Sequence, residues 1–222
     1  MRKTFILSIL YIVAGSSIYS CQSNSGSQVD TSLTQYVDPF IGSSGHGHVF
    51  VGANVPFGGV QVGPSNEYKG WDWSSSYHYS DSILKGFTHL NLSGTGMADL
   101  GELLIMPGTG PMHNDHSAGH FNGKNGYASF YSKSTEVVKP GYYKVMLESY
   151  DIKAEITTTE RVGYHRYTYP ANEQSRIILD MSQGNCDVPV ETYLRQIDAT
   201  TIEGWRSSEG WAQKQIEYIT VK

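Results

Sequence analysis

Cysteine, clustered basic residues and long apolar runs are all scarce in this sequence. Two cysteines in 222 residues are too few for the disulfide framework typical of small secreted domains. The 16 basic residues face 21 acidic ones and form no cluster, which argues against nucleic acid as a partner. The apolar run Phe5–Gly15 is too short for a comfortable membrane span.

Helical periodicity is also lacking, and this favours an all-β fold. No stretch carries an amphipathic helical stripe beyond a turn or two, and no segment repeats. From Gly141 onward, apolar and polar residues alternate in short β-branched and aromatic runs separated by turn residues. The stretch 156–170 gives the strongest signal for a pair of strands. The sequence therefore predicts a β-sandwich, and its length suits one large all-β domain or two small ones.

The stretch Tyr36–Gly126 has a different texture, rich in glycine, histidine and serine. Glycine at this density weakens helices and marks turns, bulges and places where the backbone closely approaches something. We expect short, irregular strands there rather than long ones.

The N-terminus predicts export. Arg2 and Lys3 precede the apolar run and small residues follow it, as in a secretory signal peptide over residues 1–20. The segment Ile18–Cys21 looks like a relaxed bacterial lipobox, in which Cys21 becomes the lipidated N-terminus. The alternative is ordinary cleavage nearby, with Cys21 incidental.

Residues 21–35 are polar and predict a flexible tether between a lipid on Cys21 and the folded domain. Without Arg2 and Lys3 the chain keeps 14 basic residues against 21 acidic ones, a net charge of about −7. No acidic cluster follows Cys21, so we expect an outer-membrane lipoprotein that faces the periplasm. Its contact with the membrane would be through the lipid alone.

Two histidine-rich stretches raise the question of a metal site. The sequence GHGH places His46 and His48 two residues apart, a spacing that puts both on one face of a strand. No third ligand follows at a useful spacing, so hydrogen bonding to a ligand or a neighbouring domain is favoured over metal. The stretch His113–His120, HNDHSAGH, superficially resembles a zinc site, but it lies in a polar connection where a solvated loop is the default.

The stretch GWDWSSSYHY, Gly70–Tyr79, concentrates aromatic side chains. It could be a buried aromatic knot or a surface that holds a flat, hydroxylated ligand such as a sugar ring, and the residues alone leave both open. Asp72, Asp81 and Asp99 could suggest a glycosidase acid and base, but nothing in the sequence ranks them. For Asp81 a turn-capping role is favoured.

Five long motifs, in order, resemble the N-terminal domain of glycoside hydrolase family 92, the exo-acting α-mannosidases of Bacteroidetes. They are YVDPFIG, GHGHVFVGANVPFG, GWDWSSSYHYSD, GFTHLNLSGTGMADLGELLIMP, and KPGYYKVML followed by TTERVGYHRYTYP. The resemblance covers residues 36–222. It implies that these residues form the N-terminal β-sandwich that precedes an (α/α)6 barrel in the family.

The resemblance also implies a chemistry and a division of labour. Family members invert the anomeric centre, so one carboxylic acid protonates the leaving oxygen while a carboxylate activates water on the opposite face. The barrel supplies this acid, this base and the ligands of an essential calcium ion. The sandwich contributes loops that wall the pocket, including an aromatic side chain that packs on the sugar in the leaving-group subsite. By motif match, the aromatic is Trp71 or Trp73, and the residues nearby are Asp72, His46, His48, His78 and His89.

The chain ends inside the strand-like run Ile216–Lys222, which suggests an interrupted protein lacking the barrel. We therefore expect the substrate-pocket domain of a calcium-dependent inverting α-mannosidase acting on terminal, mainly α-1,2-linked mannosides of N-glycans or mannans. It would be inactive alone, with calcium needed only in the full-length enzyme and the barrel as its partner domain. Two alternatives are a free-standing mannose- or glycan-binding lipoprotein and a subunit whose barrel is a separate chain.

Overall fold

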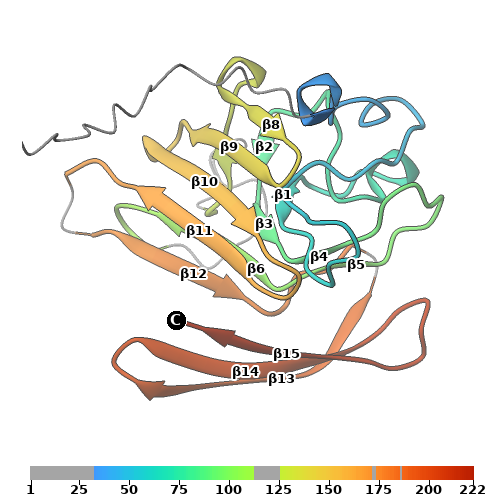
Figure 1. Ribbon diagram of the computed structural model, residues 1–222. Helices are drawn as coiled ribbons and strands as arrows, with labels where there is room; N and C mark the ends of the chain where they lie inside the picture. The colour runs from blue at the N-terminus through green and yellow to red at the C-terminus, as the bar shows by residue number, and fades with distance from the viewer. Residues whose placement is uncertain (1–32, 113–125, 172–173, 186) are drawn as a thin grey trace, which may run out of the picture. The chain divides into compact units, whose positions relative to one another are not determined.

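The computed structural model describes residues 33–112, 126–171, 174–185 and 187–222 (Figure 1). Cys21, the signal peptide, most of the tether and the histidine-rich stretch 113–120 lie outside the described residues. Within the described part of the chain, no helix is long and apolar enough to cross a membrane.

Antiparallel strands in three sheets and two small ribbons make up the fold. The first sheet has the order β1 (Gly63–Ser65), β3 (Gly86–Thr88), β6 (Leu104–Gly108), β12 (Arg176–Asp180). The second has the order β11 (Gly163–Thr168), β10 (Ile152–Thr158), β9 (Tyr142–Leu147), β8 (Val137–Lys139). The third has the order β13 (Val188–Asp198), β14 (Thr201–Glu209), β15 (Gln215–Val221). The ribbons pair β2 (Ile83–Leu84) with β7 (Ser129–Phe130) and β4 (Leu90–Asn91) with β5 (Leu100–Glu102). The described residues also contain three short 3-10 turns: η1 (Leu33–Tyr36), η2 (Trp71–Trp73) and η3 (Lys133–Thr135).

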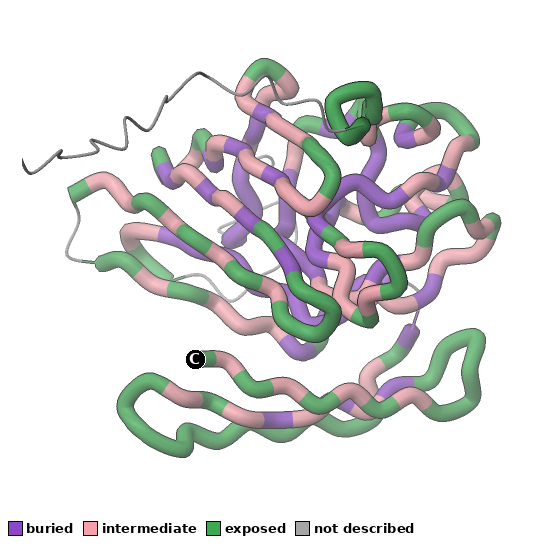
Figure 2. The backbone as a smooth tube through the Cα atoms, viewed as in Figure 1, coloured by how far each residue is buried: buried purple, intermediate pink, exposed green. Residues whose placement is uncertain are grey.

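The core lies between the first and second sheets. Along β9 and β10 every second residue is buried, as period-two alternation requires when one face of a sheet is covered. Phe87 of β3 packs against Tyr143 of β9, with ring centroids 6.2 Å apart. Figure 2 shows the buried residues concentrated along these strands. The predicted β-sandwich is therefore confirmed, as is the strand pair over 156–170, where Thr158 lies opposite Gly163.

The glycine-rich half forms short strands, as expected, and its glycines sit where the chain approaches itself. A Cβ on Gly47 would lie 1.9 Å from the carbonyl oxygen of Gly42. A Cβ on Gly63 would lie 2.3 Å from the carbonyl oxygen of Val51. Side chains larger than hydrogen are excluded at both positions, so the close approach inferred from the sequence is to the protein's own backbone.

A buried arginine makes the most extensive of the contacts that attach the third sheet to the rest of the fold, beside hydrogen bonds from Ser208 to Glu102 and from Gln215 to Asp99. The guanidinium of Arg206, on β14, donates 2.7 Å to Glu102 on β5 and 2.9 Å to the carbonyl oxygen of Met181. It also pairs with Asp187 at 2.5 Å, and the side chains of all three charged residues are buried. Burial and the neighbouring Asp187 raise the pKa of the Glu102 carboxyl.

Candidate functional site

The two tryptophans of GWDW point to different surroundings because the backbone turns there. Trp71–Trp73 form the 3-10 turn η2, with Trp73 N–H donating to the Gly70 carbonyl and Gly70 at φ 116. A 3-10 turn has three residues per turn, so side chains two positions apart diverge. Trp71 is 53% exposed, whereas Trp73 is half-buried.

The Trp71 indole is held in place at the surface by three neighbours. Its Nε1–H donates 2.6 Å to the carbonyl oxygen of Gly96. The His48 ring meets it edge-on with centroids 4.2 Å apart, and the His46 ring lies tilted at 5.4 Å. An exposed indole with a fixed orientation is suited to stacking against the apolar face of a ligand.

Asp72 ties both histidines of GHGH to this turn. Its Oδ1 lies 2.6 Å from His46 Nδ1 and 3.6 Å from His48 Nε2. The hydrogen bond with His46 holds the pKa of the Asp72 carboxyl below its ordinary value. Asp72 is therefore an ionised acceptor at neutral pH and is poorly suited to donate a proton.

His48 itself adopts an unusual backbone conformation that fixes the loop. It is buried with φ 54, a left-handed value that non-glycine residues seldom adopt. Its carbonyl oxygen accepts a hydrogen bond of 2.7 Å from the Gly94 N–H. This bond joins the GHGH loop to the turn SGTG, Ser93–Gly96, beside Trp71. Backbone strain of this kind is typical of ligand-contacting segments.

Trp73 and His78 form a second, more enclosed cluster. Their rings stack with centroids 4.4 Å apart, and Trp73 Nε1–H donates 3.0 Å to Asp81 Oδ2. Lys69 also pairs with Asp81 at 2.6 Å. Asp81 Oδ1 accepts from the backbone N–H of Ser82, which is the turn-capping role favoured from the sequence. The motif thus contains both of the arrangements that its sequence left open.

His89 lies apart from both clusters, in a buried pair with His165 of β11. Its Nδ1 donates 2.7 Å to the carbonyl oxygen of Leu103, so its Nε2 carries no proton and accepts from His165 Nε2 at 3.0 Å. His165 Nδ1 then accepts 2.7 Å from the Tyr167 hydroxyl. Burial lowers the pKa of both imidazoles, that of His165 to about 3, and keeps both rings neutral.

Sequence reasoning missed two contributors to the Trp71 cluster. Gly96 supplies a backbone carbonyl to the Trp71 indole. The Ser93 hydroxyl accepts a hydrogen bond from the Phe50 N–H and so holds the segment around Phe50. Neither contact has a residue-type signal, because any residue carries a carbonyl and serines are common. Only the SGTG turn, which brings a small residue against the indole, hinted at close packing.

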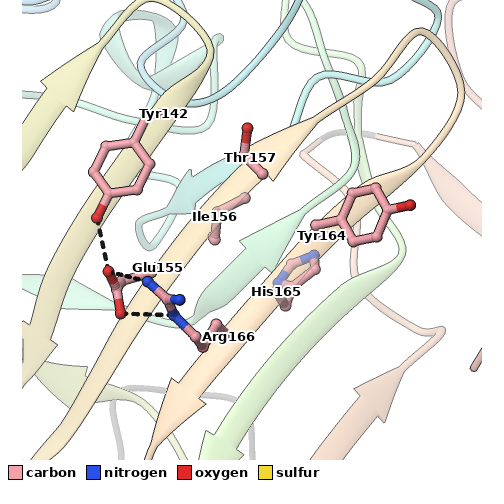
Figure 3. A pocket seen from close by; sticks show the side chains of 7 residues that line it. All are labelled: Tyr142, Glu155, Ile156, Thr157, Tyr164, His165 and Arg166. Carbon is pink, nitrogen blue, oxygen red and sulfur yellow. Dashed lines mark hydrogen bonds and ion pairs between the residues drawn. The ribbon is translucent and has the colours of Figure 1, made fainter. Parts of the chain in front are cut away.

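A separate shallow hollow lies on the outer face of β9, β10 and β11 (Figure 3). Arg166 donates to both carboxylate oxygens of Glu155, and the Tyr142 hydroxyl donates to one of them at 2.9 Å. These bonds lower the pKa of Glu155 to about 2. The charged groups of this hollow, Arg166 and Glu155, are paired with each other. The Trp71 cluster is therefore the stronger candidate site.

Among the described residues, no group of three or more His, Cys, Asp or Glu side chains is placed to hold a metal ion. Calcium prefers six to eight oxygen ligands, and Asp72, the carboxylate in the Trp71 cluster, is engaged by two histidines. The residues of this cluster do not fit a calcium site.

Comparison with known proteins places these observations in a family context. The model of the glycosyl hydrolase family 92 N-terminal domain matches residues 36–222. The solved family GH92 alpha-mannosidase of Bacteroides thetaiotaomicron in complex with mannoimidazole is 40% identical, with a TM-score of 0.81 over 84% of this chain. The chain spans 24% of the length of that protein.

Two more distant relatives agree with this match. A family GH92 inverting mannosidase from Bacteroides thetaiotaomicron is 17% identical, with a TM-score of 0.60 over 85% of this chain and 29% of its own, and it supports the fold alone. A protein named as an uncharacterized secreted glycosidase, from Arthroderma benhamiae, is 29% identical over 65% of this chain and 18% of its own.

Proposed function

Because this chain belongs to the family of glycosyl hydrolase family 92 N-terminal domains, related to alpha-mannosidases, we propose that its Trp71 cluster forms one wall of a pocket for terminal α-mannosides. The observation that carries the proposal is an exposed, oriented indole next to an ionised carboxylate. Sugars present apolar ring faces and many hydroxyl groups, and this pair of side chains is complementary to both.

Each residue of the cluster has a role that its geometry supports. Trp71 packs on the sugar in the leaving-group subsite, and Asp72 accepts hydrogen bonds from sugar hydroxyls. His46, exposed and bonded through Nδ1, can present its other ring nitrogen to the ligand. His48 is buried and supports the indole from below. These contacts bind and orient the substrate.

The reaction of the whole enzyme would be inverting hydrolysis. One carboxylic acid protonates the leaving oxygen while a second carboxylate activates water on the opposite face. Asp72 does not fit the acid because its pKa is lowered. We propose that the acid and base belong to the (α/α)6 barrel of the full-length enzyme, and that the present chain binds mannosides without hydrolysing them.

Calcium dependence is likewise proposed for the full-length enzyme, with ligands outside the Trp71 cluster. Calcium supplies a hard cation for sugar hydroxyls when bound. For substrate we propose α-1,2-linked mannosides of N-glycans or mannans, which extends the likeness of this chain to alpha-mannosidases. Linkage choice then depends on how the second sugar meets the indole.

Export is supported by the secreted relative, and we propose that a lipid on Cys21 anchors the protein to the periplasmic face of the outer membrane. The second candidate function is a free-standing glycan-binding lipoprotein. The exposure of Trp71 favours it, because an indole at the surface can stack on a sugar without a second domain.

An assay of the chain on α-1,2-mannobiose, with calcium and with a chelator, tests the proposal. We expect binding that Trp71→Ala weakens and no release of mannose under either condition. Mannose release that the chelator abolishes would contradict the proposed division of labour between sandwich and barrel. Binding that Trp71→Ala leaves unchanged would instead contradict the proposed pocket.

A further inference from the structure

The third sheet has two chemically different faces. On β14, Gly204, Arg206 and Ser208 are buried, and the residues between them are half-exposed on the opposite face. Strand alternation assigns the partners of Trp205 on β13 and β15 to that opposite face as well. We name this side, which carries Tyr193, Trp205 and Tyr218, the outer face.

Three aromatic side chains form a row across the outer face. Tyr193 lies directly opposite Trp205, and Trp205 lies directly opposite Tyr218. The rings of Tyr193 and Trp205 are nearly parallel, with centroids 6.4 Å apart and an interplanar angle of 23°. Tyr193 is 45% exposed and Tyr218 is 77% exposed, so the rings at both ends of the row are accessible to solvent.

The dimensions of the row suit a short stretch of polysaccharide. Neighbouring strands lie roughly 4.8 Å apart, so the row extends about 10 Å from Tyr193 to Tyr218. This length matches about two linked sugar rings, whose apolar faces can lie on successive aromatic rings.

Charge favours an uncharged occupant. Directly beside the aromatic row, Arg195 of β13 lies opposite Glu203 of β14, and its Nε donates 2.7 Å to the Glu203 carboxylate. The two charges cancel, and Glu191, opposite Ser207 on the other side of the aromatic row, adds a carboxylate that repels anionic ligands and accepts from hydroxyl groups. Thr220, opposite Glu203 on β15, adds a hydroxyl to the same row.

We propose that the outer face of β13–β15 is a second glycan-binding site, a flat platform for an uncharged polysaccharide chain. It uses different residues from the Trp71 cluster and does not rest on the mannoside pocket. Such a site would hold the protein on a polymeric substrate while a terminal sugar occupies the pocket.

Cross-strand aromatic pairs also stabilise sheets, and this simpler role would explain Tyr193 against Trp205. It does not explain Tyr218, whose side chain is largely in solvent and adds little packing. Tyr218→Ala is therefore the variant that separates binding from folding, and Trp205→Ala is the stronger but more disruptive one.

Affinity gel electrophoresis of the full chain in gels containing yeast α-mannan, galactomannan or xyloglucan tests this proposal. We expect retardation in at least one gel, reduced about tenfold in apparent affinity by Tyr218→Ala and by Trp205→Ala, as expected for the loss of one stacking contact. The matched control is Tyr164→Ala, which removes an exposed tyrosine from β11 and should leave retardation unchanged.

The Trp71→Ala variant separates the two sites. Retardation that survives Trp71→Ala and is lost in Tyr218→Ala supports the platform. Retardation lost only in Trp71→Ala, or absent from all three gels, overturns it. The competing occupant of the row is a second copy of this chain, and sedimentation velocity on the same variants tests it. A dimer that dissociates in Tyr218→Ala would make the row a protein interface and overturn the glycan assignment.

Discussion

Trp71 and Trp73 show how far residue types alone can lead. Their motif indicated both a sugar platform and an aromatic knot, and each tryptophan takes one of these arrangements. An extended backbone would place both on one face, because residues two apart in a strand share a face. They diverge because the chain forms a 3-10 turn that begins after Gly70 at φ 116. The sequence could not show which tryptophan is exposed, because that depends on contacts with Gly96 and His48, more than twenty residues away.

Asp72 gives the first prediction. Asp72→Asn should weaken binding of methyl α-mannoside about tenfold, because an ionised acceptor makes a stronger hydrogen bond than a neutral one. In the unsubstituted protein, binding should stay constant as pH falls from 7 to the ordinary aspartate value of 3.8 and decline only below it, because the pKa of Asp72 is lowered. Titrations followed by NMR at several pH values measure both effects.

The control for Asp72→Asn is Asp198→Asn, which alters another exposed aspartate of lowered pKa, the last residue of β13. Equal loss of binding in the two variants would argue against a specific role for Asp72.

The neutral histidine pair gives the second prediction. Unfolded His165 takes up a proton near pH 6.5, whereas the folded protein resists protonation until about pH 3. The contribution of His165 to stability is therefore fully present above pH 6.5 and is lost as pH falls from 6.5 towards 3. The loss is on the order of 2–3 kcal/mol between pH 7 and pH 4. His165→Gln, whose amide can still donate to His89, should make the urea midpoint less dependent on pH. An unchanged pH dependence would contradict the neutral pair.

Among whole elements, the strands after Gly141 were the most predictable. Their alternation is set by a covered sheet face, so period two in the sequence translates directly into β9, β10 and β11. The glycine-rich half was predictable only in character, since its short strands depend on close approaches such as Gly63 to Val51. The sequence predicted strands for the third sheet, but it gave no indication that Arg206 is buried.

Arg206 gives the third prediction. Arg206→Met leaves Asp187 buried without its cation and removes the hydrogen bond to Glu102, so the free energy of unfolding should fall by about 3–5 kcal/mol. The matched control is Arg195→Met, which breaks an exposed pair with Glu203 and should leave the free energy of unfolding nearly unchanged, because exposed ion pairs contribute little. Urea denaturation of both variants measures the difference. Equal losses would mean that the third sheet is not attached through Arg206.

The same cluster sets an alkaline limit. Because burial raises the pKa of Glu102, the folded protein holds a proton there that the unfolded chain releases near pH 4.5. The contribution of Glu102 to stability is thus present at acidic pH and declines as pH rises through and above that value. This trend opposes the one from His165, so stability should be greatest between about pH 4.5 and 6.5, where the two windows overlap.

The molecule as a whole belongs to a family that includes a solved alpha-mannosidase of 40% identity, and this chain covers 24% of the length of that protein. The family was predictable from the sequence because its motifs are long and in order, and they coincide with the loops around Trp71. The proposed chemistry was not derivable from these residues, since the described carboxylate of the Trp71 cluster is an acceptor and not an acid.

Export and anchoring give the fourth prediction. In a bacterial host with lipoprotein processing, the wild-type protein should incorporate labelled palmitate and sediment with outer membranes. Cys21→Ser should remove the label and release the protein, since Cys21 is the proposed point of attachment. The control is Cys186→Ser, which should keep the label. Incorporation of label into Cys21→Ser would contradict lipidation at this residue.

The central claim is that Trp71, and not Trp73, faces the sugar. Each of the four tryptophans gives one indole N–H resonance, so a titration with α-1,2-mannobiose followed by two-dimensional 15N NMR reports on each of them. The account predicts a concentration-dependent shift of the Trp71 signal, assigned by its absence in Trp71→Phe, with the Trp73 signal nearly unmoved. A shift of Trp73 with Trp71 unmoved would contradict it.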